Sequence, residues 1–157
     1  MKISALEEYG LRCLLQLARE GAEPDGATSL SARQISEREG LTLDYTSQIL
    51  AELRRAGLVT SLRGAHGGFR LARRARDITV GELFRAFDGP IAADLCDVYT
   101  GTRDVCAHAT GCSVAPVWAE LARRIYGFLD GVTVADIAAG AVERTPQVVP
   151  LAALRRR

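Results

Sequence analysis

A glycine-rich turn between two short β-type runs constrains the fold of this 157-residue chain more than any other feature. The turn is Gly64-Ala-His-Gly-Gly68, and the runs on either side of it are Leu58–Leu62 and Phe69–Leu71. Glycine adopts positive φ angles without a steric cost, and a tight hairpin needs such angles. The stretch therefore predicts a β-hairpin.

Two short helices are expected directly before this hairpin. Residues 31–34 carry the spacing of a capping box, which opens a helix that runs to about Glu39. A second helix follows over residues 42–56, with Thr42 or Asp44 as its cap. Two helices joined by a short glycine-containing turn form a helix-turn-helix, and together with the hairpin they predict a winged helix.

The surface made by the second helix and the hairpin is expected to bind DNA. Between Arg54 and Arg76 the chain has seven arginines and no carboxylate, a charge pattern that suits a phosphate backbone. Side chains at the start of the second helix can reach base edges in the major groove, and wing arginines can contact phosphates or the minor groove. The candidate DNA-binding residues are Thr42, Tyr45, Thr46, Ser47 and Gln48 on the helix and Arg63 and Arg70 on the wing, with Arg73, Arg74 and Arg76 as further phosphate contacts.

The first part of the chain reads as an amphipathic helix over residues 3–20. Its apolar face consists of Ile3, Leu6, Gly10, Cys13, Leu14 and Leu17, at i, i+3, i+4 spacing. Cys13 lies within this stripe and is expected to be a buried core cysteine. Glu8 lies off the stripe, where its ordinary role is a surface ion pair with Arg12 four residues later.

Three further helices are expected after the wing. Residues 79–82 carry a second capping box, and the short helix that they open should pack the wing onto the core. A long helix begins near Pro116, and a last short helix runs from the Thr133 cap to Gly140. The apolar stripe of the long helix consists of Val114, Val117, Trp118, Leu121, Ile125, Phe128 and Leu129. It is most simply buried against its twin in a two-fold dimer, and packing onto the first helix of the same chain is the competing explanation.

The expected fold is therefore mainly α, a winged helix-turn-helix with a small β-hairpin wing and a long C-terminal dimerisation helix. The winged helix-turn-helix domain covers residues 1–89 and is followed by a cysteine-rich loop at 90–112. The dimerisation region covers residues 113–140, and residues 141–157, which contain two prolines and three terminal arginines, are expected to be a mobile tail.

The start of the chain places Glu7 and Glu8 where a signal peptide needs an uninterrupted apolar run, and no run approaches the length of a membrane span. We therefore expect a cytoplasmic protein without a membrane partner, in a compartment where structural disulfides are rare. An enzyme is not expected, because neither of the two histidines, His66 and His108, is placed as a base beside a nucleophile.

Three of the four cysteines, Cys96, Cys106 and Cys112, lie in one polar segment with the spacing C-x9-C-x5-C. This segment has too few apolar residues to fold by burial alone, so something else must order it. Three thiolates that converge on a metal or cluster would do so, because ligand binding supplies folding free energy. A disulfide that leaves one cysteine over, or three unrelated cysteines, are the alternatives.

The order of these elements resembles the IscR/NsrR family of bacterial iron–sulfur regulators. The resemblance is carried by ISEREGLTLDYTSQILAELRRAGLVTSLRGAHGGFRL at 35–71, by ITVGELFRAFDG at 78–89 and by the cysteines, and it covers about residues 1–140. It implies a homodimeric transcriptional regulator of a roughly palindromic operator. It also implies that Cys96, Cys106 and Cys112 hold a cluster that controls DNA affinity.

The resemblance also bears on the fourth cluster ligand. Members of the IscR branch have a histidine three residues beyond the last cysteine, where this chain has Ala115, and the first cysteine spacing here is longer than theirs. In NsrR-like members a carboxylate near the N-terminus of the partner subunit completes the site, and Glu8 occupies the matching position. Glu8 is thus the expected fourth ligand, with His108 next. The remaining candidates are Asp94, Asp97, Glu7 or an exchangeable small ligand.

Carboxylate ligation favours a 4Fe–4S cluster over a 2Fe–2S cluster by the same resemblance. A hard oxygen ligand leaves one iron more reactive than thiolates alone would, which suits a sensor of nitric oxide, redox state or iron supply. The expected function is thus a repressor whose cluster controls DNA binding. The alternatives are a clusterless thiol-redox regulator and a zinc-stabilised regulator of the same fold.

Overall fold

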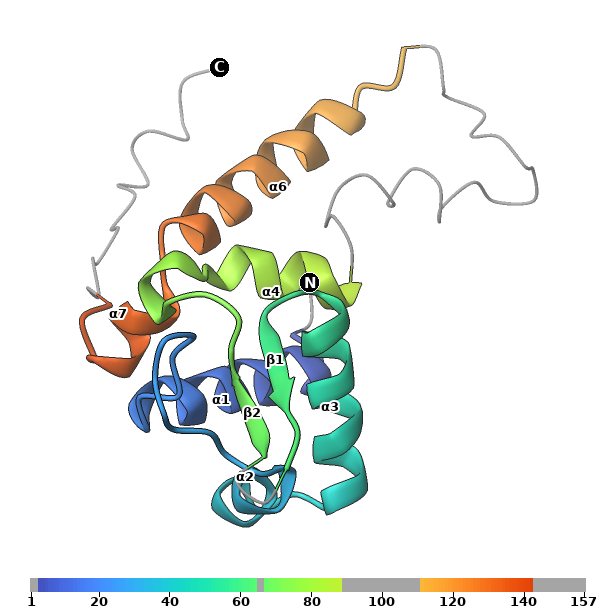
Figure 1. Cartoon of the computed structure of the whole chain (residues 1–157). Coiled ribbons are helices and arrows are strands. Elements are labelled where there is room, and N and C mark those ends of the chain that lie inside the picture. The colour runs from blue at the N-terminus through green and yellow to red at the C-terminus, as the bar shows by residue number, and fades with distance from the viewer. Residues whose placement is uncertain (1–2, 65–66, 89–110, 143–157) are drawn as a thin grey trace.

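The computed structural model describes residues 3–64, 67–88 and 111–142 of the chain. Its elements are α1 (Ala5–Arg19), α2 (Ala32–Glu39), α3 (Leu43–Arg55), β1 (Val59–Leu62), β2 (Gly68–Leu71), the 3-10 turn η1 (Ala75–Asp77), α4 (Val80–Asp88), α6 (Ala115–Asp130) and α7 (Val134–Ala138). Figure 1 shows α1 and α3 beside the hairpin and α6 extending away from this body. In this part of the chain, each helix is too short or too polar to cross a bilayer.

Local capping explains where the helices begin and end. Ser31 and Gln34 form the predicted capping box at α2, and Gly40 ends that helix in the left-handed conformation at φ +66°. Thr42 caps α3, since its Oγ1 accepts a hydrogen bond from the Tyr45 amide at 3.3 Å. The helix-turn-helix predicted from the sequence is confirmed.

The hairpin is the predicted wing. β1 and β2 are antiparallel, and their register pairs Val59 with Leu71 and Leu62 with Gly68. Leu30, which precedes α2, bridges to Phe69 and so ties the wing to the helix-turn-helix. Gly68 is required there, because a Cβ at this position would lie 2.7 Å from the Leu30 carbonyl oxygen.

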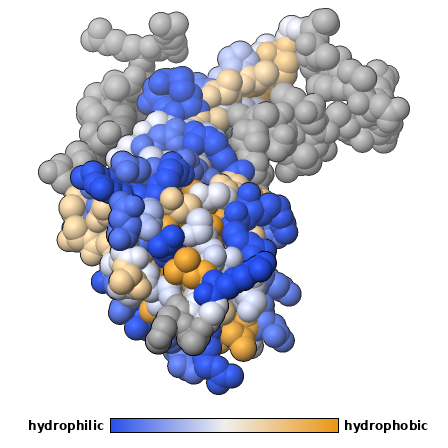
Figure 2. All heavy atoms as spheres, in the orientation of Figure 1, coloured by the Kyte–Doolittle hydropathy of each residue, from blue (hydrophilic) through white to orange (hydrophobic). Residues whose placement is uncertain are grey.

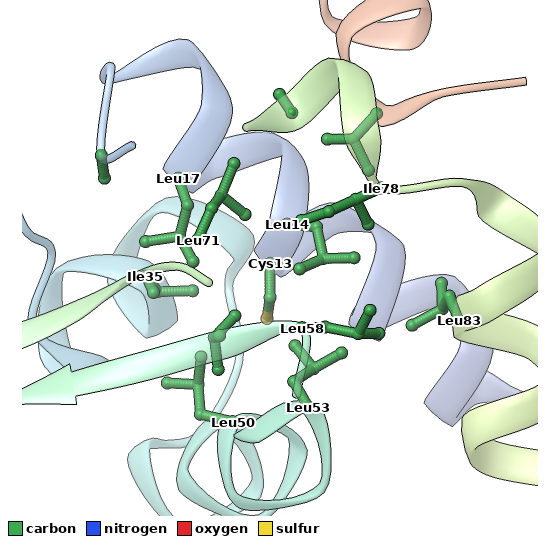
Figure 3. Close-up of a cluster of buried hydrophobic side chains, with 14 of the residues drawn as sticks. Cys13, Leu14, Leu17, Ile35, Leu50, Leu53, Leu58, Leu71, Ile78 and Leu83 are labelled. Atoms are coloured by element: carbon green, nitrogen blue, oxygen red, sulfur yellow. The ribbon is translucent and has the colours of Figure 1, made fainter. Parts of the chain in front are cut away.

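The core lies between α1, α3 and the hairpin. α1 contributes Cys13, Leu14 and Leu17, which have no exposed surface and belong to one buried cluster with residues of α2, α3, α4 and the hairpin (Figure 3). The predicted apolar face of this helix is correct except at Ile3, which is 59% exposed. Ile3 lies outside the helix, because the Ser4 side chain forms a capping box with Glu7 and α1 begins at Ala5.

The C-terminal helices pack against partners that the sequence did not indicate. α6 packs on α4, and the short α7 packs against α1. Val134 of α7 is fully buried, and Thr133 bridges to Thr79 just before α4. The predicted capping boxes at Thr79 and Thr133 are both present. Within the single chain, α6 therefore packs on α4 and not on α1, which was the alternative to a dimer that the sequence left open.

Candidate nucleic-acid interface and cluster ligands

The first two turns of α3 present polar side chains to solvent. Thr42, Ser47 and Gln48 are all exposed. Two of these three side chains also bond to their own helix, since Thr42 caps it and the Ser47 hydroxyl donates to the Leu43 carbonyl at 2.8 Å. The Gln48 amide has no such bond within the described residues. It therefore keeps both a donor and an acceptor for another molecule.

The expectation that Thr46 is exposed is wrong. Its side chain has 0% exposed surface, and its hydroxyl donates to the Thr42 carbonyl at 3.0 Å. Thr46 precedes Leu50 by four residues and Leu53 by seven, so helical periodicity places it on the buried stripe of α3. A threonine in this position cannot reach a base edge.

Tyr45 is half-buried and joins α3 to α1. Its ring meets the ring of Tyr9 edge to face, with centroids 6.0 Å apart. This contact could not be predicted from the spacing of residues along the chain, because Tyr9 and Tyr45 come from different helices. Tyr45 thus packs partly against the core, while Thr42 and Ser47 near it in the chain are exposed.

The two candidate wing arginines differ in their surroundings. Arg63 follows β1 and is exposed beside Gly64, which has φ +104°. Arg70 lies in β2 opposite Thr60 and is half-buried. Its Nε is shielded from solvent and has no hydrogen-bond partner within the described residues. Ala65 and His66 lie outside the described residues.

Two of the further phosphate candidates are already paired. Arg73 donates to Glu82 at 2.8 Å and to the Asp77 carbonyl at 2.9 Å. Arg74 lies 3.6 Å from Asp25. Charge counting along the chain missed these carboxylates because they lie outside the arginine-rich stretch. Arg63 is therefore a freer cation than Arg73 or Arg74.

Cys13 is a core residue, as its spacing predicts. Figure 3 shows its sulfur among leucine side chains of neighbouring elements. Burial raises the pKa of the Cys13 thiol to about 12. A thiol that stays protonated at neutral pH is a poor metal ligand. The thiols left for a cluster are those of residues 96–112.

Cys112 is the one cysteine of that segment within the described residues. It is half-buried and lies three residues before α6 begins. Cys96, Cys106, His108, Asp94 and Asp97 all lie outside the described residues. Within the described ranges, no three His, Cys, Asp or Glu side chains gather into a metal site.

The two candidate carboxylates of α1 have different environments. Glu7 is only 3% exposed, and its carboxylate accepts from the Ser4 amide at 2.6 Å in the capping box. The Glu8 side chain is 47% exposed and pairs with Arg12 at 2.7 Å, as expected. A surface ion pair of this kind is weak and exchangeable. Glu8 is therefore available to a ligand, whereas Glu7 is held in its own helix.

Arg12 connects Glu8 to the helix-turn-helix. Its guanidinium lies 3.8 Å from Glu39 at the end of α2 and 5.7 Å from the ring centroid of Tyr9. Glu39 also accepts from Gln16 at 2.5 Å. Glu8 is thus linked through Arg12 to α2, and through Tyr9 to Tyr45 of α3. Only the spacing of Glu8 and Arg12 was visible in the sequence.

Comparisons with known proteins agree with this geometry. The sequence profile of the Rrf2 family, described as iron-dependent transcriptional regulators, matches residues 3–140. Protein rrf2 of Nitratidesulfovibrio vulgaris is 34% identical over 137 residues, which cover 87% of each chain. The structure of T. potens IscR is similar with a TM-score of 0.69 and 33% identity, over 90% of this chain and 88% of that one. CymR, the global cysteine regulator of B. subtilis, is similar with a TM-score of 0.69 and 29% identity, over 89% and 98%.

Proposed function

Because the chain belongs to the Rrf2 family of transcriptional regulators, we propose that it is a dimeric repressor whose DNA affinity is controlled by an iron–sulfur cluster. One observation carries the proposal. Cys112 lies three residues before α6, a helix with an exposed apolar face, and the cysteine segment follows α4 of the winged helix in the chain. A ligand held by this segment can therefore influence both the DNA-binding body and the surface that faces a second subunit.

DNA recognition is assigned to α3 and the wing. Gln48 offers the donor and acceptor pair that reads adenine in the major groove. Thr42, Ser47 and Tyr45 are the other candidate contacts on this part of α3, and Arg63 and Arg70 carry the positive charge of the wing. Two such units related by a two-fold axis suit a roughly palindromic operator. Such a regulator works in the cytoplasm, where bacterial DNA lies.

Replacing Gln48 by alanine should weaken specific binding by about 1–3 kcal/mol, the usual contribution of one bidentate base contact. Discrimination at one A·T position should be lost, while affinity for unrelated DNA and its dependence on salt stay as in the parent. Fluorescence anisotropy with the operator and its single-base variants measures both. An equal loss on specific and unrelated DNA would contradict a base-reading role for Gln48.

The dimer is assigned to the exposed face of α6. Val114, Val117, Trp118, Leu121 and Phe128 are 41–61% exposed. Figure 2 shows orange-tinted residues along this projecting helix. An apolar stripe of this length is typical of a subunit interface. Ile125 and Leu129 are half-buried in the single chain and complete the stripe.

The donor set fits a cluster. Cys96, Cys106 and Cys112 supply three thiolates, and Glu8 of the partner subunit supplies one exposed carboxylate. We favour a 4Fe–4S cluster over a 2Fe–2S cluster for this ligand set. Bound there, the cluster would supply an iron that reacts with nitric oxide or an oxidant, or that responds to iron supply.

The residues around Glu8 provide a route to the recognition helix. A Glu8 that binds a metal is withdrawn from Arg12, which is left with Glu39 of α2 and the ring of Tyr9. Tyr9 in turn contacts Tyr45 in the first turn of α3. Metal binding at Glu8 can thus influence the position of the helix-turn-helix. A coupling free energy of about 1–3 kcal/mol between cluster binding and DNA binding would suffice for regulation.

Glu8→Gln tests the fourth ligand, because glutamine keeps the shape of the side chain and removes its charge. We expect the variant to retain the parent's melting temperature and to lose iron about tenfold faster when exposed to air or a chelator. Glu20→Gln is the matched control, since Glu20 also lies in a surface ion pair, with Arg38. A cluster lifetime equal to that of the parent would remove Glu8 from the ligand set.

The decisive experiment is anaerobic purification followed by iron, sulfide and visible-absorption analysis, with DNA binding measured before and after air or nitric oxide. A brown protein with about four irons per chain supports a 4Fe–4S sensor, and about two irons would favour 2Fe–2S. A colourless protein that still binds DNA would replace the proposal with a thiol-redox or zinc-stabilised regulator. A change in DNA affinity when the cluster is lost is the expected result.

A further inference from the structure

The C-terminal end of α6 is joined to α4 by a pair of charged side chains that no motif indicates. Arg85 donates two hydrogen bonds to Asp130, at 2.8 Å to Oδ1 and 2.6 Å to Oδ2. The Arg85 guanidinium also lies 4.4 Å from the ring centroid of Tyr126, one turn earlier on α6. A guanidinium held at its two nitrogens and on its face has one orientation, so the contact is geometrically specific.

Gly81 makes this approach possible. A Cβ at Gly81 would lie 2.0 Å from Asp130 Oδ1 and 3.2 Å from an Arg85 nitrogen. Glycine is a poor residue for a helix and alanine is the best one, so local preference does not explain Gly81 in the first turn of α4. The close approach of the Asp130 carboxylate explains why position 81 is a glycine. Hydrogen bonds from Arg85 lower the pKa of Asp130.

The backbone reinforces the same joint. The Val80 amide donates to the Val132 carbonyl at 2.9 Å, and the Val134 amide donates to the Ile78 carbonyl at 2.9 Å. α6 is therefore fixed to the body at its C-terminal end, while its N-terminal half extends away with Val117 and Trp118 exposed (Figure 1). Because α6 is held at its C-terminal end, a small rotation there moves its N-terminal end by a larger distance.

We propose that the Arg85–Asp130 pair, admitted by Gly81, sets the angle between α6 and the winged-helix body, and with it the spacing of the two recognition helices on DNA. The proposal rests on the dimer proposed above. α6 has 16 residues and is about 24 Å long, so a tilt of about 8° at the joint moves a point at its far end by about 3 Å. This is close to the rise of one base pair, so small changes at the joint alter the operator spacing that fits best.

The joint is a positioning device rather than a large source of stability. Arg85 and Asp130 are 42% and 43% exposed, and pairs in such surroundings contribute little to folding. Their loss should therefore change which DNA spacing is preferred more than it changes the melting temperature. If the pair only stabilised the fold, its loss would lower the melting temperature and leave the preferred DNA spacing unchanged.

The test uses the full chain in its cluster-bound form, and operator DNA selected from a random library by the parent protein. The spacing between half-sites is then changed by one or two base pairs, and affinities are measured for the parent, Arg85→Ala, Gly81→Ala and the control Arg123→Ala. Arg123 is a suitable control because it pairs with Glu120 of the same helix and, among the described residues, has no ion pair with another element. Gly81→Ala keeps the test valid if Arg85→Ala fails to fold, since alanine favours the helix.

We expect the parent and Arg123→Ala to lose affinity about tenfold when the spacing changes, and the two joint variants to lose less than about threefold or to prefer a new spacing. A dimeric parent whose spacing profile is kept by both joint variants would overturn the positioning role and leave the proposed function intact. A parent that sediments as a monomer and is indifferent to spacing would overturn the dimer, and this proposal with it.

Discussion

Replacing Cys112 by alanine is expected to abolish cluster binding. The three cysteines of residues 96–112 are the thiols available for ligation, because Cys13 is enclosed in the core with its pKa raised to about 12. Two thiolates and one carboxylate are too few ligands to hold an iron–sulfur cluster firmly. Iron and sulfide per chain should fall to near zero after anaerobic purification, and the visible absorption should disappear.

DNA binding by the Cys112→Ala protein should no longer respond to nitric oxide or air, because the responsive group is gone. Cys13→Ala is the matched control, since it removes a thiol from α1 and not from the ligand set. It should retain full iron content while losing about 1 kcal/mol of stability, because it leaves a small cavity among the core leucines. Parental iron content in the Cys112→Ala protein would show that this thiol is not a ligand.

Replacing Gly10 by valine is expected to lower the free energy of unfolding by about 3 kcal/mol or more. Gly10 is buried where α1 crosses α4, and a Cβ there would lie 2.4 Å from the Phe87 ring and 3.2 Å from Leu83. A valine side chain must push α4 away from α1. Because α6 packs on α4, its contact with the body is disturbed as well. Gly10→Ala should give an intermediate loss.

Thermal unfolding at a fixed protein concentration measures this effect, with an expected fall of about 6–12 °C for Gly10→Val. Gly127→Val is the control, because Gly127 also lies in a helix but a Cβ there would meet no atom within 4 Å. That variant should be unchanged or slightly more stable, since valine is a better helix former than glycine. A loss in Gly10→Val no larger than that in Gly127→Val would rule out the α1–α4 contact as the cause of the effect.

Local signals predicted most of the secondary structure. The capping boxes at Ser31, Thr79 and Thr133 are all present, and Gly40 and Gly140 end their helices at positive φ. Each of these features depends on residues three or four apart, so its physical cause lies within one turn of chain. The antiparallel wing followed from its glycine-rich turn for the same reason.

The candidate site was predicted less completely. Gln48 and Arg63 are exposed as expected, whereas Thr46 is buried because it shares the helical stripe of Leu50 and Leu53. The side chains that engage Arg73 and Arg74 come from α4 and from the loop before α2. No charge count along the sequence could have identified these partners. The residues that complete the expected cluster site lie mostly outside the described ranges.

By itself, the sequence determined the winged helix-turn-helix, the buried Cys13 and the family of transcriptional regulators to which the chain belongs, because caps, turns and periodic stripes are local patterns. Only the tertiary structure decided what the helices pack against. Arg85 and Asp130 are 45 residues apart, and Tyr9 and Tyr45 belong to different helices. Such contacts depend on how close-packed elements fit together in space, a property that no single stretch of the chain contains.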